Sequence, residues 1–423
     1  MKIKLTILII EDEPDLRTSL AANVREAAAS LNVDVSVLEA GSAYDATRLQ
    51  LTHAVDAVFV DYHLQDGESG RVAVDAMRDP FGRLYVVLVS GASAQELSGD
   101  LAALHERLKL RLEFVPKPVP PLKVHYSVAR FKDFVMSRPA PHPLAVALKV
   151  ARQGSNPTLQ LQGMERAFEL ILKISVFIMA SDLATRGISA LDSDTPGFAQ
   201  MLTLGPWLAL AEKLGAKYRL LGDAAFAPEL PNDLKRNRGG VIGVIRSFKP
   251  VRDDEIHHGL PTDGMGHEAR IKEYRPRFDQ LVESLGFLRD LVWAASEDVD
   301  IAAGEDFAYL LRVFMGESDR FESVPLSSRE RLERRRVYAF DGRLRRLSLY
   351  PFVLWTACET CNRGRLFLLD NFNGHFSYKD VFNHVIADPT ANADLMKLNQ
   401  GLITPAAETA SEAVTIPATS QGL

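Results

Sequence analysis

Apolar segments in the first third of the chain end at residues that carry chemistry. One segment runs into Glu11 and Asp12, a second ends at Asp61, a third ends at Ser90, and a fourth leads through a proline to Lys117. The carboxyl ends of parallel strands meet at one edge of a sheet, where ligand sites form. If these segments are parallel strands, three carboxylates, a hydroxyl and an ammonium group converge on one point. Such a set can hold a divalent metal beside a carboxylate that accepts a phosphoryl group.

Strand-like and helix-like patterns alternate through residues 1–136. The expected strands are residues 5–10, 33–39, 57–60, 85–90 and 112–116. The expected amphipathic helices are residues 15–29, 42–51, 70–78, 94–108 and 122–136. Alternation at this spacing predicts a doubly wound, five-stranded parallel α/β sheet with helices on both faces.

Residues 1–136 resemble a receiver domain of bacterial two-component response regulators, which has a flavodoxin-like fold. The resemblance implies that Asp61 is the phosphoacceptor. It also implies a Mg²⁺ ion held by Glu11, Asp12, Asp61 and the backbone carbonyl of His63. Magnesium prefers oxygen ligands and keeps several waters, so few carboxylates are needed to hold it.

The same resemblance assigns three further residues. Lys117 matches the lysine that binds the phosphoryl group, Ser90 the hydroxyl that moves toward it, and Phe114 the aromatic residue that follows that hydroxyl. The expected partner is a sensor histidine kinase or a phosphotransfer protein, and a homodimer is expected. Phosphorylation would then be a regulatory event, with the output elsewhere in the chain.

The remaining two thirds divide by composition. Residues 137–147 hold several closely spaced prolines and are predicted to be a linker. Residues 148–293 show helical periodicity, which predicts a helical bundle. Residues 294–387 show aromatic and β-branched runs between turn signals, which predict a small β-rich domain. Residues 388–423 are rich in Ala, Thr, Ser and Pro, which predicts a disordered tail.

The helical region contains Arg252 and the histidine pair His257 and His258, which Gly259 follows. On one helix such residues approach the same face. Arginine can bind a phosphate and histidine can move protons, which suits metal-free phosphodiester cleavage. The pattern resembles the Arg-x4–6-His motif of HEPN domains, and the glycine favours His258 over His257. The resemblance implies either a metal-independent ribonuclease, with RNA as substrate, or a module that binds a protein partner or nucleic acid without cleaving it.

The β-rich region offers two further features. Cys358 and Cys361 have the spacing of half a zinc knuckle, and His375 and His384 could complete a set of four ligands. The alternative is two ordinary thiols. An arginine concentration over residues 329–346 either binds RNA phosphates or is a solvated surface with Arg/Glu pairing.

Composition excludes some classes of protein. The formal net charge of −6 does not suit a protein that coats nucleic acid. Two cysteines give no disulfide framework. The first apolar segment is too short for a signal peptide, and no apolar run approaches the ~20 residues of a membrane span. We therefore expect a cytoplasmic protein without a membrane partner.

Overall fold

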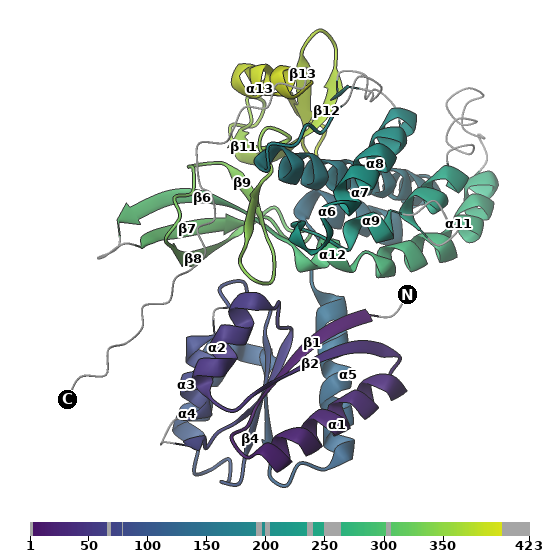
Figure 1. Ribbon diagram of the computed structural model, residues 1–423. Helices are drawn as coiled ribbons and strands as arrows, with labels where there is room; N and C mark the ends of the chain where they lie inside the picture. Colours follow the sequence, from purple (N-terminus) through teal and green to yellow (C-terminus); the bar gives the residue numbers. More distant parts are fainter. Residues whose placement is uncertain are drawn as a thin grey trace.

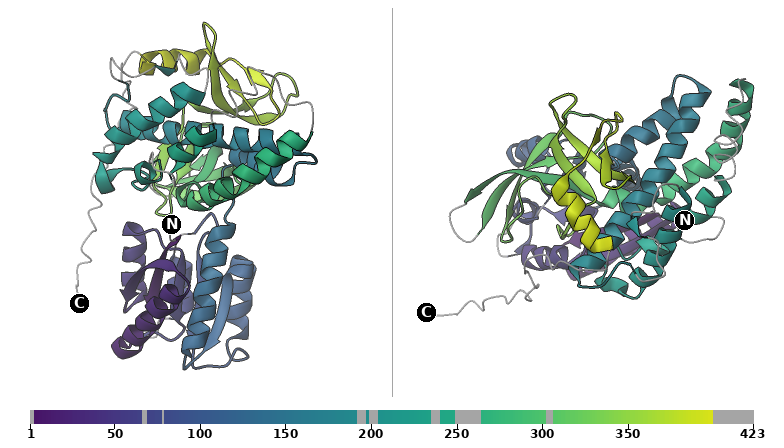
Figure 2. Two further views of the ribbon diagram at one scale, coloured as in Figure 1. Left: turned by 90° about the vertical axis from the view of Figure 1, so that its right-hand side faces the viewer. Right: turned by 90° about the horizontal axis from the view of Figure 1, so that it is seen from above.

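The structure is a computed structural model that describes residues 3–65, 69–77, 79–191, 197–198, 204–234, 240–248, 264–301 and 306–399. The polypeptide forms an α/β body of residues 3–137 and a C-terminal body of residues 142–399, which lie at opposite ends of the molecule (Figures 1 and 2).

The α/β body is built on a five-stranded sheet of order β2-β1-β3-β4-β5. All of its neighbouring strands pair in parallel. The strands are β1 (Ile3–Ile10), β2 (Val33–Ala40), β3 (Ala57–Asp61), β4 (Tyr85–Ser90) and β5 (Leu112–Pro116). The helices are α1 (Pro14–Ser30), α2 (Ala43–Thr52), α3 (Gly70–Ala76), α4 (Ser98–Leu108) and α5 (Pro121–Ser137). The predicted doubly wound parallel sheet is confirmed, and its strand order is the flavodoxin-like one.

Strand alternation explains why helices cover both faces of this sheet. In β1, Leu5, Ile7 and Ile9 point into a core formed with α1 and α5. The intervening Leu8 and Ile10 point into the opposite core, formed with α2, α3 and α4. Successive side chains of a strand point to opposite faces, so apolar residues at every position produce a strand buried on both sides.

The segment between the two bodies is shorter than the predicted linker of residues 137–147. Helix α5 ends at Ser137, and α6 (His142–Gln153) already includes Pro143. A proline in the first helical turn loses no hydrogen bond, because the N–H groups there have no partner within the helix. The prolines therefore separate two helices instead of forming a long extended spacer.

The first half of the C-terminal body is helical, as predicted. Its helices are α6, α7 (Pro157–Thr185), α8 (Leu204–Arg219), α9 (Leu230–Asp233), residues 241–248, α11 (Gly264–Ser284) and α12 (Gly286–Asp290). A short 3-10 turn, η4 (Gly222–Ala224), precedes α9. Helix α7 is buried around its whole circumference from Gly163 onward, apart from a few positions, which is typical of a helix at the centre of a bundle.

Two antiparallel sheets complete the C-terminal body. One has the order β10-β9-β6-β7-β8, and the other has the order β11-β12-β13-β14. The strands are β6 (Val292–Ile301), β7 (Phe307–Val313), β8 (Glu322–Ser328), β9 (Val337–Phe340), β10 (Arg346–Ser348), β11 (Val353–Ala357), β12 (Gly364–Phe372), β13 (Phe376–Lys379) and β14 (Val385–Ile386). The predicted β-rich region is therefore present, and a hairpin turn that includes Asp341 and Gly342 joins β9 to β10.

The predicted boundary between residues 293 and 294 falls inside a single hydrophobic core. That core joins residues of the helices to residues of both antiparallel sheets. Phe177 of α7 stacks on Phe352 beside β11, with ring centroids 5.1 Å apart and an interplanar angle of 11°. Trp293, at the predicted boundary, is fully buried. The helical and β-rich segments therefore pack as one body, because neither covers its own apolar surface alone.

The predicted disordered tail begins too early. Residues 389–399 form α13 (Pro389–Asn399), whose Ala391 and Leu395 are buried in the same core. Asp388 caps this helix by accepting a hydrogen bond from the N–H of Ala391 at 2.8 Å. Two apolar anchors and a cap stabilise a helix that composition alone does not predict. Residues 400–423 lie outside the described part of the chain.

The two bodies meet at the amino ends of the parallel strands. Arg138, between α5 and α6, forms ion pairs with Asp56 at 2.9 Å and with Asp290 at 3.0 Å. Asp56 immediately precedes β3, and Asp290 ends α12. Nearby, the rings of Phe81 and Phe340 are in contact, with centroids 5.3 Å apart. This junction lies at the edge of the sheet opposite to the edge where Asp61 ends β3. Among the described residues, no helix has the length and apolar character needed to cross a membrane.

Candidate functional site

The predicted site residues meet at the carboxyl edge of the parallel sheet. Glu11 and Asp12 follow β1, Asp61 ends β3, Ser90 ends β4, and Lys117 follows β5. In each case an apolar run immediately precedes the polar or charged residue at the strand end. The parallel registers place these strand ends side by side. The convergence inferred from the sequence is therefore present in the structure.

Three carboxylates cluster at this edge, and two of them contact one ammonium group. Glu11, Asp12 and Asp61 each offer a carboxylate oxygen, and these oxygens lie within 4.8 Å of one another. Lys117 Nζ lies 2.8 Å from Oδ2 of Asp61 and 2.9 Å from Oε2 of Glu11. Glu11 and Asp61 are only 4% and 5% exposed, respectively, whereas Asp12 is half-buried. One lysine does not balance three acids, so the cluster retains a negative charge that suits a divalent cation with oxygen ligands.

The protonation of Glu11 and Lys117 depends on their burial and on their neighbours. Burial raises the pKa of Glu11, and the negative charge of Asp61 adds to this effect, while Lys117 opposes it. Burial by itself lowers the pKa of Lys117, but hydrogen bonds to Asp61 and Glu11 outweigh burial, so its pKa is raised. The lysine therefore remains charged at neutral pH and holds its position between the two buried acids.

The loop after Asp61 is held close to the end of β3 by its backbone. The N–H of His63 lies 3.3 Å from Oδ1 of Asp61, and the N–H of Gly70 donates to the carbonyl of Tyr62 at 2.7 Å. A Cβ atom at Gly70 would lie 2.1 Å from the backbone oxygen of Asp61. Only glycine allows helix α3 to begin this close to the end of β3.

Ser90 and Phe114 lie on the neighbouring strands β4 and β5, beside the strand that Asp61 ends. Ser90 is fully buried, and its Oγ accepts a hydrogen bond from the N–H of Ala92 at 3.0 Å. Its carbonyl accepts from the N–H of Lys117 at 2.7 Å. Phe114 is half-buried and packs against the core beneath α2, α3 and α4. Ser90 is therefore connected to Lys117 by a backbone hydrogen bond, and Phe114 lies in β5, the strand that leads to Lys117.

Sequence reasoning did not identify a polar network next to Asp61. The hydroxyl of Tyr62 donates to Asp100 of α4, and Arg71 of α3 pairs with the same carboxylate. The hydrogen bond to Asp100 raises the pKa of Tyr62, and the bonds from Tyr62 and then Arg71 lower the pKa of Asp100. The network joins the residue after Asp61 to α4. No local sequence pattern predicts this network, because Asp100 is 38 positions from Tyr62 in the chain.

The structure describes some of the site residues predicted in the C-terminal body and not others. Arg252, His257 and His258 lie outside the described residues, between the helix of residues 241–248 and α11. The arginine-rich segment is described, and its arginines form ion pairs that include Arg346 with Glu330 at 2.8 Å and Arg336 with Glu333 at 2.7 Å. This pairing favours the solvated-surface alternative over a dedicated phosphate-binding surface.

Neither a protein-family model nor a curated protein matches the chain. Solved structures similar to the N-terminal part include the N-terminal domain of an uncharacterized protein from Wolinella succinogenes, which is 25% identical, with a TM-score of 0.26 and coverage of 30% of this chain and 94% of that one. The receiver domain of the PhyR response regulator from Erythrobacter litoralis is 26% identical, with a TM-score of 0.26 and coverage of 31% and 92%. A receiver domain protein from Clostridium thermocellum is 18% identical, with a TM-score of 0.26 and coverage of 30% and 94%.

The second and third of these structures are described as receiver domains. The fold of residues 3–137 is established by the parallel strand order and by the helices on both faces. This is the order found in flavodoxin and in single-domain receivers.

Proposed function

We propose that the chain is a two-component response regulator in which Asp61 accepts a phosphoryl group from a sensor histidine kinase or a phosphotransfer protein. The supporting observation is the arrangement at the carboxyl edge of the sheet. There the Asp61 carboxylate lies beside two further acids and 2.8 Å from the Lys117 ammonium group.

The residues present fit a Mg²⁺ ion. Glu11, Asp12 and Asp61 would hold it, together with the backbone carbonyl of His63. When bound, the ion neutralises charge on the phosphoryl oxygens and so permits attack by a carboxylate. Asp61 is the nucleophile in this proposal, and Lys117 binds a phosphoryl oxygen as a point charge. Ser90 would donate its hydroxyl to another phosphoryl oxygen, and Phe114 would move with it.

The proposal includes receiver pairing as the route of the signal. The junction with the C-terminal body lies at the amino edge of the sheet, through Arg138 and Asp56, whereas the acceptor lies at the carboxyl edge. A change at Asp61 would act first through Ser90 of β4 and Phe114 of β5, and so on the face that carries α4 and β5. A homodimer formed through that face would alter how two C-terminal bodies face each other.

The first experiment tests the acceptor. Wild type, Asp61→Asn and the control Asp34→Asn, which alters an exposed acid on β2, are treated with Mg²⁺ and acetyl phosphate and analysed by intact mass. We expect one added phosphoryl group in wild type and the control and none in Asp61→Asn. The mass of each phosphorylated form in solution then reports dimerisation. Equal labelling of Asp61→Asn and wild type would exclude Asp61 as the acceptor.

For the output, the HEPN resemblance supports RNA cleavage, with Arg252 holding the phosphate and His258 or His257 as acid/base. A fluorescent single-stranded RNA is incubated with the phosphorylated and unphosphorylated protein. His257→Ala and His258→Ala are compared with His375→Ala, which alters an exposed histidine in the turn between β12 and β13. We expect cleavage to be lost only in the output variants. Absence of cleavage by every form, together with a partner captured only by the phosphorylated protein, would favour the non-enzymatic alternative.

A further inference from the structure

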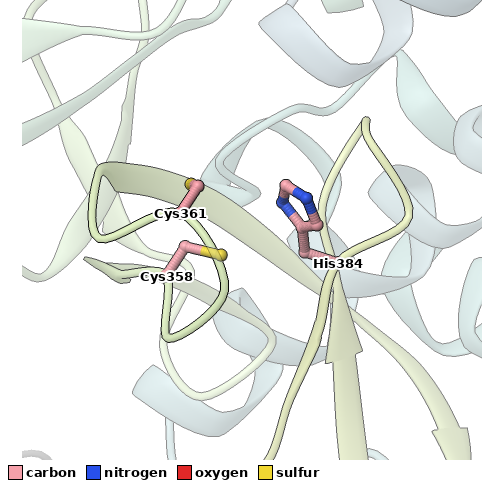
Figure 3. A group of neighbouring side chains, drawn as sticks. All are labelled: Cys358, Cys361 and His384. Carbon is pink, nitrogen blue, oxygen red and sulfur yellow. The ribbon is translucent and has the colours of Figure 1, made fainter.

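Two hairpin turns of the last sheet bring two thiols and an imidazole together, far from the acceptor. Cys358 and Cys361 lie in the turn between β11 and β12, and His384 lies in the turn between β13 and β14. Their ligand atoms, two sulfurs and one ring nitrogen, all lie within 4.8 Å of one another. Figure 3 shows both cysteine side chains in one turn and the imidazole on the facing turn.

The backbone fixes the positions of the two cysteines. The N–H of Cys358 donates to the carbonyl of Arg363 at 2.8 Å, and the N–H of Asn362 donates to the carbonyl of Cys358 at 2.7 Å. Asn362 has a φ of 52°, in the left-handed region that asparagine tolerates better than most residues. Both thiols are therefore presented by a tight, hydrogen-bonded turn.

A buried carboxylate fixes the imidazole. Asp380 is 2% exposed, and its Oδ2 lies 3.0 Å from Nδ1 of His384. Its other oxygen accepts hydrogen bonds from the backbone N–H groups of Phe382 at 2.9 Å and of His384 at 2.8 Å. A carboxylate that orients a histidine in this way commonly accompanies a metal-ligating imidazole and sets which nitrogen carries the proton. It is an observation independent of the clustering of the three ligands.

We propose that Cys358, Cys361 and His384 bind a zinc ion, with a water molecule as the fourth ligand. Zinc favours thiolate and imidazole ligands at about 2.3 and 2.0–2.1 Å in tetrahedral geometry, which places ligand atoms about 3.5–3.8 Å apart. The three atoms already lie within 4.8 Å of one another, so small side-chain movements complete the site. Two thiolates and a neutral imidazole balance the charge of a divalent ion.

The structure also distinguishes the two histidines that the sequence left open. His375 is exposed in the turn between β12 and β13 and is not part of the three-residue group, whereas His384 is half-buried. A disulfide between the two cysteines would not involve His384, and so it would not explain why Asp380 orients the imidazole toward them.

Zinc at this position would tie two turns of the sheet together. The guanidinium of Arg365 already lies over the ring of Phe382, with its Cζ 4.1 Å from the ring centroid, so the turns are in contact. The ion would add a link between the β11–β12 turn and the β13–β14 turn. Removal of the metal is therefore expected to loosen the β13–β14 turn, without altering the acceptor edge of the α/β body.

The test measures metal in the full-length protein purified from zinc-supplemented cells without a metal-affinity tag. We expect one zinc ion per chain by mass spectrometry of the metal. Replacement by Co²⁺ should give a sulfur-to-cobalt charge-transfer band and the strong visible bands of tetrahedral coordination. His384→Ala and Cys361→Ser should lose at least ten-fold in zinc affinity, whereas His375→Ala, the matched control on the neighbouring turn, should retain the metal.

Specific outcomes would overturn the proposal. They are a wild-type protein without zinc and with a Cys358–Cys361 disulfide, or a His384→Ala variant that binds zinc as tightly as His375→Ala. If a variant fails to fold, as judged by circular dichroism, the cobalt spectrum of the wild type decides alone. A spectrum with no thiolate band would contradict the site. Asp61 phosphorylation should be unchanged in His384→Ala, so failure of the zinc site and failure of the acceptor are distinguishable.

Discussion

Lys117 Nζ lies 2.8 Å from Oδ2 of Asp61, although the two residues are 56 positions apart in the chain. The same nitrogen lies 2.9 Å from Oε2 of Glu11, so one ammonium group is shared by two buried acids. The charges of Asp61 and Lys117 therefore influence the pKa of Glu11, and the two acids influence the pKa of Lys117.

Replacing Lys117 with alanine should slow phosphorylation of Asp61 by about 10²-fold, as expected when a preorganised charge at a reacting oxygen is removed. Intact-mass time courses with acetyl phosphate measure the rate. Lys123→Ala, which alters a half-exposed lysine at the start of α5, is the control and should match wild type. Equal rates for the two variants would mean that Lys117 does not contact the phosphoryl group.

Glu11 should make the stability of the metal-free protein depend on pH. Burial, followed by the charge of Asp61, raises its pKa above the ordinary value of 4.5, so the folded state favours the protonated form. Its stabilising contribution is present below that ordinary value and is lost as pH rises through the raised one. A tenfold difference in the acid dissociation constant between the folded and unfolded states corresponds to about 1.4 kcal/mol.

The measurement is denaturant unfolding of wild type and Glu11→Gln, in the presence of EDTA, at a series of pH values. As the pH rises, the free energy of unfolding of wild type should fall relative to that of Glu11→Gln. Added Mg²⁺ should reverse this loss in wild type. A difference that does not vary with pH would show that Glu11 has the same pKa in both states.

Gly70→Ala should destabilise the α/β body by about 1–3 kcal/mol, because the new Cβ overlaps the backbone of the acceptor strand. The added atom would lie 2.1 Å from the oxygen of Asp61. The control is Gly99→Ala in α4, where a Cβ meets nothing within 4 Å. This change should stabilise the protein by about 0.5–1 kcal/mol through helix propensity. Thermal unfolding of both variants tests the contrast, and the same sign for both would contradict it.

Arg138→Ala should weaken the junction between the two bodies by about 3 kcal/mol, because it leaves Asp56 buried without its cation. Burial raises the pKa of Asp56 and Arg138 opposes this, so the loss should be smaller at mildly acidic pH, where Asp56 takes up a proton. The double variant with Asp56→Asn should regain part of the stability in denaturant unfolding at neutral pH. If the double variant is less stable than Arg138→Ala, the ion pair does not explain the loss.

The order of elements in the α/β body could be predicted because short, mostly apolar strand-like segments alternate with amphipathic helical segments. The rule that parallel strands present their carboxyl ends at one edge then predicted that Glu11, Asp61 and Lys117 lie together. The helical and β-rich character of the remaining described residues also followed from local periodicity.

Contacts between distant segments could not be predicted in this way. The single core that unites α7 with the antiparallel sheets depends on how apolar faces meet in three dimensions, and local patterns do not encode that meeting. The same holds for α13, which is helical because Ala391 and Leu395 are buried against that core. The network of Tyr62, Arg71 and Asp100 likewise depends on the packing of α3 beside α4.

Local patterns along the chain are sufficient to place Glu11, Asp61 and Lys117 at the strand ends, and so to predict which chemical groups meet at that edge of the sheet. Only the folded structure shows that the C-terminal body attaches at the opposite edge, through Arg138, and that His384 instead of His375 faces the two cysteines. The difference lies in how far apart in the chain the interacting residues are. Strand periodicity is set by neighbours in the chain, whereas junctions and ligand sets depend on side chains that folding brings together from distant positions.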